Sequence, residues 1–175
     1  MQLHFKIILF LTITSFSFNL SEYSYATDLD LSKGFCDISW GTKTNTLSDL
    51  KKIAGTLNVI YYTRTENPYE IYGENLGRVI YGFYRGRLFS ALLDIAGKEK
   101  FERTLNGLVD EFGSPDVQYR VGHDIYTWEI EKVKIKLKHF DIQKIHKLFF
   151  YYTPLSKMLN ENEISSTEDL LLEIQ

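Results

Sequence analysis

The strongest constraint on the fold is a stretch in which two alternating segments match each other across a short turn. Residues 124–130 and 133–140 each alternate apolar and polar side chains, which is typical of strands with one buried face. With Glu131 and Lys132 as the turn, the apolar residues share one face and the lysines the other. A slip by one residue would bury the lysines, so the pattern also predicts the register. The predicted pairs are Ile130–Val133, Trp128–Ile135, Tyr126–Leu137, Glu129–Lys134, Thr127–Lys136 and Ile125–Lys138.

Other segments rich in β-branched and aromatic residues predict further strands. Arg85-Gly86 predicts a tight turn between two of them. In the segment 147–153, aromatic side chains alternate between the two faces, so that both faces are aromatic. We therefore expect this segment to be a central strand in the core. The predicted strands cover residues 35–40, 58–63, 69–72, 78–84, 88–95, 117–120 and 147–153.

Two segments have helical spacing. Residues 98–112 carry apolar side chains at i, i+4, i+7 and i+11 and are followed by Gly113 and Pro115, which predicts a helix that ends there. Residues 46–55 begin with a Thr46–Asp49 capping pair and predict a second helix, with Leu47, Leu50 and Ala54 on one face. The expected fold class is therefore α+β, with antiparallel sheet packed against two helices.

A faint internal repeat relates the two expected helices. Residues 47–61 resemble residues 105–119 at one constant offset, each with leucines, then Gly, then Thr or Ser, then a strand. The simplest architecture is two tandem α-β-β-β units. Chance similarity is the alternative.

The first 26 residues have the order of a secretory signal. Lys6 is followed by a short apolar run, and Ser24 and Ala26 supply small residues before Thr27. The apolar run is shorter than the roughly 20 residues that a spanning helix needs. We therefore expect an exported protein, periplasmic or extracellular, with no transmembrane segment in the mature chain. A lipid anchor is not expected, because Cys36 does not directly follow the apolar run.

The remainder divides into one α+β domain over 27–154 and an acidic linker with a short C-terminal helix over 155–175. A capping pair precedes the apolar end of that helix, which we expect to bind a partner through Leu170, Leu171, Leu172 and Ile174. The net charge of −3 offers no basic footprint for nucleic acid. The single cysteine excludes an internal disulfide, and we expect Cys36 to be a small buried residue beside Phe35 and Trp40.

Three stretches carry a family resemblance: 35–42 (FCDISWGT), 78–88 (RVIYGFYRGRL) and 112–115 (FGSP). Together they resemble a group of uncharacterised exported bacterial proteins with an F-x-x-I-x-W-G-T-like start. The order of helix, G-x-P and Trp-containing strand is also loosely similar to the SmpA/OmlA-type lipoproteins of outer-membrane assembly. That resemblance implies a scaffold role, although this chain lacks their lipidation site. Neither resemblance implies a catalytic residue.

The candidate chemical groups are few. His139 and His146 flank a predicted turn and can approach each other, and with Asp141 they would resemble a two-histidine, one-carboxylate metal site. The spacing matches no standard ligand motif and lysines surround it, so ordinary histidines are the preferred interpretation. Cys36 lacks the surroundings of a nucleophile. We predict no catalytic residue, no metal site and no cofactor.

The last candidate is a stripe of alternating lysines, Lys132, Lys134, Lys136 and Lys138, on one sheet face. It could bind an anionic ligand or polymer, or it could be a solvated outer face. Our leading expectation is an exported, non-enzymatic binding or scaffold module that acts on another envelope or extracellular macromolecule. The alternatives are an anion binder that uses the lysine stripe and a small secreted hydrolase. The sequence leaves open whether the chain dimerises through Cys36 or through a sheet edge.

Overall fold

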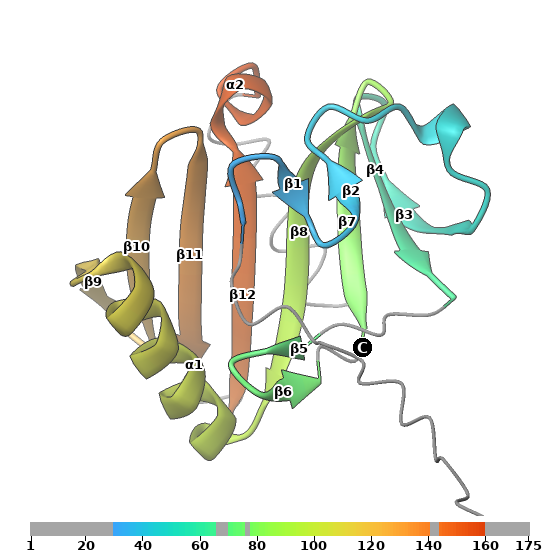
Figure 1. The fold of residues 1–175 in the computed structure, drawn as a ribbon. Coiled ribbons are helices and arrows are strands. Elements are labelled where there is room, and N and C mark those ends of the chain that lie inside the picture. The colour runs from blue at the N-terminus through green and yellow to red at the C-terminus, as the bar shows by residue number, and fades with distance from the viewer. Residues whose placement is uncertain (1–29, 66–69, 76–77, 141–143, 160–175) are drawn as a thin grey trace, which may run out of the picture.

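The computed structural model describes residues 30–65, 70–75, 78–140 and 144–159 (Figure 1). Its centre is an eight-stranded antiparallel sheet, and two small hairpins and the helices pack around it, which confirms the α+β class. In spatial order the sheet strands are β3 (Leu50–Gly55), β4 (Val59–Arg64), β7 (Val79–Tyr84), β8 (Arg87–Ala96), β12 (Ile145–Tyr152), β11 (Val133–Phe140), β10 (His123–Ile130) and β9 (Asp116–Arg120). The hairpins are β1 (Gly34–Phe35) with β2 (Ile38–Ser39), and β5 (Glu70–Ile71) with β6 (Glu74–Asn75); the helices are the 3₁₀ turn η1 (Thr44–Thr46), α1 (Lys98–Phe112) and α2 (Thr153–Ser156).

The strand order divides the sheet into two like halves. β3, β4, β7 and β8 follow one another as neighbours, and so do β9, β10, β11 and β12. The two halves meet where β8 pairs antiparallel with β12, and α1 connects β8 to β9. Each half therefore ends at the centre of the sheet, and β3 and β9 form its two outer edges.

The hairpin predicted across Glu131 and Lys132 is confirmed in every pair. Ile130 lies opposite Val133, and Glu129 lies opposite Lys134. Glu131 adopts the left-handed conformation that the turn requires, with φ of 48°. The Arg85-Gly86 turn and the helix over 98–112 are confirmed as well.

The helix predicted over 46–55 is wrong. Residues Leu50–Gly55 form strand β3, and only the single 3₁₀ turn η1 precedes it. The register shifts between Lys52 and Ala54. Because of this bulge, Leu50 packs against one face of the sheet while Ile53 and Ala54 pack against the other. An apolar spacing that suits a helix therefore places side chains on both faces of this edge strand. As a result, the internal repeat aligns residues of α1 with residues of strand β3.

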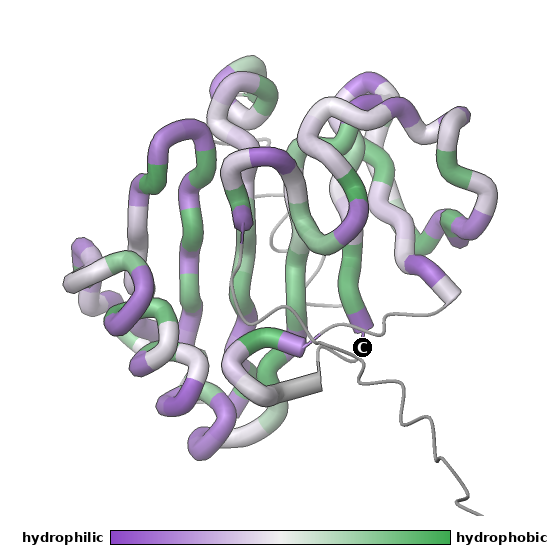
Figure 2. Tube along the Cα trace, in the orientation of Figure 1, coloured by the Kyte–Doolittle hydropathy of each residue, from purple (hydrophilic) through white to green (hydrophobic). Residues whose placement is uncertain are grey.

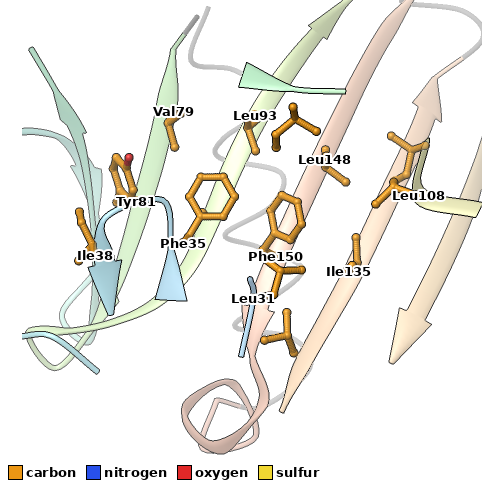
Figure 3. Close-up of a cluster of buried hydrophobic side chains, with 14 of the residues drawn as sticks. Leu31, Phe35, Ile38, Val79, Tyr81, Leu93, Leu108, Ile135, Leu148 and Phe150 are labelled. Atoms are coloured by element: carbon orange, nitrogen blue, oxygen red, sulfur yellow. The ribbon is translucent and has the colours of Figure 1, made fainter. Parts of the chain in front are cut away.

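The first face of the sheet carries the main core. Phe101 and Leu108 of α1 pack on it, together with Phe35 and Ile38 from β1 and β2 and Ile71 from β5. These elements lie in front of the sheet in Figure 1. Figure 3 shows Phe35 between Tyr81 and Phe150, whose ring centroids lie 6.4 and 4.9 Å from that of Phe35.

A second apolar cluster occupies the opposite face. Phe149 and Tyr151 of β12 belong to it, and Leu155 and Leu159 from the segment that follows β12 pack against it. Both faces of β12 are therefore buried, as predicted for a central strand. The apolar and polar residues that alternate along β11 can be followed in Figure 2. Contacts with the sheet continue to Leu159, past the expected domain boundary at residue 154.

The segment 35–40 is a hairpin of two short strands, where one extended strand was predicted. Cys36 and Asp37 form its turn, and Cys36 has a φ of 53°. The expectation that Cys36 is buried is therefore wrong: the tight turn exposes it. Its neighbours do pack inward, since Phe35 is fully buried and the indole of Trp40 stacks on Tyr152 at 5.8 Å.

Candidate functional site

The candidate site is the surface where β11 and β12 run side by side on the second face of the sheet. Lys134, Lys136 and Lys138 project there from β11, and Phe149 and Tyr151 project from β12. We call these five residues the lysine–aromatic face. Period-2 alternation in both strands places them on one side, and the register sets Lys134 opposite Tyr151 and Lys136 opposite Phe149.

The lysines contact the aromatic rings diagonally. The Nζ of Lys136 lies 5.5 Å from the ring centroid of Tyr151, and the Nζ of Lys138 lies 5.3 Å from that of Phe149. Both are cation–π distances. The lysine stems therefore lie along the rings, and the three lysines are only partly exposed. The face thus carries partly exposed lysines packed on buried aromatic rings, which differs from a row of fully solvated lysines.

Lys132 and Lys134, the other two lysines of the predicted stripe, make different contacts from those of Lys136 and Lys138. Lys132 lies in the exposed turn before β11, and its carbonyl accepts a hydrogen bond from the backbone N–H of Thr153 at 2.7 Å. Lys134 pairs with Glu129 at 3.0 Å between Nζ and Oε1, as the cross-strand pattern predicts. The hydrogen bond and charge of Lys134 lower the pKa of Glu129.

Sequence reasoning missed Lys147, which extends the basic row. It lies opposite Lys138 in the register and is 3% exposed. Its Nζ pairs with Oδ1 of Asp94 in β8 at 3.0 Å, and such a partner is needed because an isolated buried charge is costly. Its place two residues before Phe149 in the same alternating strand was the available signal.

The buried aromatic layer beneath the lysines continues across the centre of the sheet. Phe89 and Tyr61 lie over Gly82, where a Cβ atom would come within 3.1 Å of the Phe89 ring and 2.9 Å of the Tyr61 ring. The same Cβ atom would come within 2.1 Å of Ser90 Oγ, so glycine leaves the space that Ser90 and the two rings occupy. The lysine–aromatic face is thus the charged border of a larger buried aromatic layer.

His139 and His146 do approach each other, as their positions around a turn suggested. Their Nδ1 atoms lie 2.8 Å apart, and the rings are stacked with centroids at 4.6 Å. Phe101 of α1 packs against both rings at 4.9 and 4.8 Å. The pair is thus part of the contact between α1 and the sheet. Asp141 lies outside the described residues, and among those described no group of three His, Cys, Asp or Glu side chains is placed to hold a metal ion.

Cys36 lies in the turn between β1 and β2. Although the residue as a whole is exposed, neighbouring atoms desolvate its sulfur, and this effect and, next, the charge of Asp37 raise the pKa of the thiol to about 12. Both effects disfavour the thiolate, which is the reactive form of cysteine. The neighbouring Asp37 is itself paired with Arg64 of β4.

The predicted partner-binding residues Leu170, Leu171, Leu172 and Ile174 lie outside the described residues, as does the predicted signal over 1–26. In the described part of the chain, no helix is long and apolar enough to cross a membrane. Comparison with protein families, with curated proteins and with solved structures finds no match in any of the three. The resemblance to exported bacterial proteins therefore stays a prediction.

Proposed function

We propose that this protein is an exported, non-enzymatic binding or scaffold module that holds another macromolecule of the envelope or extracellular space through its lysine–aromatic face. The observation that supports this most directly is the placement of partly exposed lysines beside aromatic rings on one sheet face. Such a surface suits an anionic ligand, because the lysines are partly exposed whereas Phe149 and Tyr151 beside them are buried.

The chemistry of the face defines the ligand class. Ammonium groups attract carboxylates and phosphates, whereas Phe149 and Tyr151 are 2% and 6% exposed and offer little surface of their own to a ligand. An acidic polypeptide and a phosphate-bearing polymer share the negative charge, whereas only the polypeptide adds apolar side chains. We favour the polypeptide, because the chain's own acidic segment begins directly after Leu159, which packs on this face of the sheet.

Two charge-reversal variants of equal charge test this function. Lys134→Glu with Lys136→Glu changes the proposed face, and Lys51→Glu with Lys52→Glu makes the same change on the exposed edge strand β3. Binding of the full chain to a polymer of glutamate and tyrosine, and to polyphosphate, can be measured by fluorescence anisotropy. We expect the first variant to lose about tenfold or more in affinity for the polypeptide and the second to keep it. Equal effects of the two variants would reject the face, and stronger binding of polyphosphate would favour the anionic-polymer alternative.

The chain carries a segment with the proposed ligand chemistry. Leu159, the last described residue, is buried on the second face, and the sequence after it is acidic and ends in the apolar group Leu170, Leu171, Leu172 and Ile174. We therefore expect this segment to compete for the lysine–aromatic face. A chain that ends at Leu159 should bind the acidic polypeptide more tightly than the full chain, and unchanged affinity would reject the competition.

Export is the second part of the proposal, and its support is the N-terminal sequence. Cleavage after Ala26 would leave a chain that begins at Thr27. Mass spectrometry of the protein recovered outside the cytoplasm tests this directly. An intact N-terminus, or a protein found only in the cytoplasm, would contradict it.

A further inference from the structure

The two edges of the eight-stranded sheet differ in how they would meet another strand. Edge strand β3 carries the exposed residues Lys51 and Lys52 and has a shift in register beside them. Like charges and bulges are the usual protection against pairing with a further strand. The opposite edge, β9, has an unbroken register with β10, and its two charged residues, Asp116 and Arg120, are of opposite sign. The two edges lie at opposite sides of the molecule in Figure 1.

β9 also exposes apolar side chains. Tyr119 is 77% exposed, and Val121, directly after the strand, is 102% exposed. Within the described part of the chain, β9 pairs with β10 alone. An edge with a regular ladder and exposed apolar side chains is a template for another strand.

The turn between β9 and β10 shows which backbone groups face outward. Arg120 and His123 pair across the two residues Val121 and Gly122. The pair that closes a two-residue hairpin turn is hydrogen-bonded, and hydrogen-bonded pairs alternate along an antiparallel ladder. The N–H and C=O groups of Val117 and Tyr119 therefore point away from β10, toward the open edge.

The sequence of β9 is complementary to itself when it is reversed. In an antiparallel pair of two copies centred on Gln118, Val117 lies opposite Tyr119 of the second copy, and Asp116 lies opposite Arg120 of the second copy. The outward backbone groups of Val117 and Tyr119 then bond to each other across the pair. The same register joins opposite charges twice, because the pair is symmetric.

We propose that β9 is a homodimer interface, in which two copies of this chain join their sheets edge to edge about Gln118. The side chains agree with this arrangement. Val117 lies opposite Tyr126, which packs on the first core, so Val117 and Tyr119 share the α1 side of the sheet. Val117 of one copy would there cover the exposed ring of Tyr119 in the other. On the second face, the Arg120 guanidinium donates to Gln118 at 3.1 Å and stands beside the position of the incoming Asp116.

Charge exchange at the two ends of β9 tests the interface. Asp116→Arg places two arginines opposite each other in the dimer, and Arg120→Asp places two aspartates there. Mixing the two variants restores an opposite pair at both ends. Asp110→Arg, on the exposed side of α1, is the control for the same change in charge.

Analytical ultracentrifugation of the full chain over a wide concentration range is the measurement. We expect each single variant to weaken dimerisation by about tenfold or more, the equimolar mixture to recover it, and Asp110→Arg to leave it unchanged. Both substituted residues are exposed, and unaltered thermal unfolding confirms that the fold survives. A parent chain that stays monomeric, or a mixture that associates no better than the single variants, would overturn the proposal. Neither result bears on the lysine–aromatic face, which lies on other strands.

Discussion

The ring of Tyr72 lies directly against Gly107 of α1. A Cβ atom at residue 107 would stand only 2.4 Å from Cγ of Tyr72, and the Tyr72 hydroxyl donates a hydrogen bond to Glu111 at 2.6 Å. This contact holds the β5–β6 hairpin on the helix, where both cover the first face of the sheet.

Gly107→Ala should therefore destabilise the protein, although alanine favours helices over glycine by about 1 kcal/mol. We expect the free energy of unfolding to fall by about 1–3 kcal/mol, because the new methyl group displaces the Tyr72 ring. Urea denaturation measures this. Asn106→Ala, at an exposed position in the same helix, is the control and should change stability little. A gain in stability for Gly107→Ala would show that the ring moves away at no cost.

The thiol of Cys36 should react slowly in spite of its exposure. A pKa of about 12 leaves less thiolate at pH 8 than an ordinary cysteine has, so alkylation by iodoacetamide should be slow and should accelerate only at strongly alkaline pH. Asp37→Asn removes a charge that raises this pKa, and it should speed the reaction at pH 8. Mass spectrometry of the alkylated fraction over time gives both rates. A reaction that levels off near pH 9 would contradict the expectation.

Arg64 ties three segments of the chain together. Its Nη1 pairs with Asp37 in the β1–β2 turn and its Nε with Asp49 before β3, each at 2.5 Å. Because the guanidinium is largely buried, Arg64→Gln should lower the free energy of unfolding by about 1–3 kcal/mol. Arg64→Lys should recover only part of this, since one ammonium group cannot reproduce the fork.

The matched comparison for Arg64 is Arg103, which pairs with Glu99 on the exposed side of α1. Arg103→Gln should cost no more than about 0.5 kcal/mol, as is usual for exposed helix pairs. Thermal and urea unfolding of the three variants separate these cases. Equal losses for Arg64→Gln and Arg103→Gln would contradict the bridging role of Arg64.

Glu131 carries backbone strain that a different residue would relieve. Its φ of 48° is in the left-handed region, which costs side chains other than Gly and Asn about 1–2 kcal/mol. Glu131→Asn should raise the free energy of unfolding by about 0.5–1 kcal/mol. Lys132→Asn, at the adjacent turn position, should give no such gain. A loss of stability for Glu131→Asn would show that the glutamate makes a compensating contact.

The parts of the fold that local pattern determines were predicted. The β10–β11 register followed from alternation, because a one-residue slip reverses every side chain. The apolar stripe of α1 and the glycine that follows it predicted both ends of that helix. The strand β3 was not predicted, because its apolar residues serve two faces through a bulge and so imitate a helical period.

The candidate site was predicted only in part, for a related reason. Alternation placed Lys134, Lys136 and Lys138 on one face, but only the tertiary pairing of β11 with β12 shows that aromatic rings lie beside them. The burial of Lys147 depends on Asp94 from β8, which is distant in sequence. Contacts of this kind involve no local period, so a single sequence does not reveal them.

The seam between β8 and β12 has a consequence for how the chain folds. Each half of the sheet forms largely through short connections, whereas pairing Ala91 with Phe150 closes a segment that contains α1 and three strands. Closing a long segment costs chain entropy before any contact repays it, so docking of the two halves should limit the folding rate. Stopped-flow refolding should then be slowed by Phe150→Leu at the seam. A substitution that weakens the Glu131 turn should also slow refolding and leave the unfolding rate nearly unchanged, because the turn is already formed when the two halves dock. The protein would thus fold as two meanders that are completed separately and joined last.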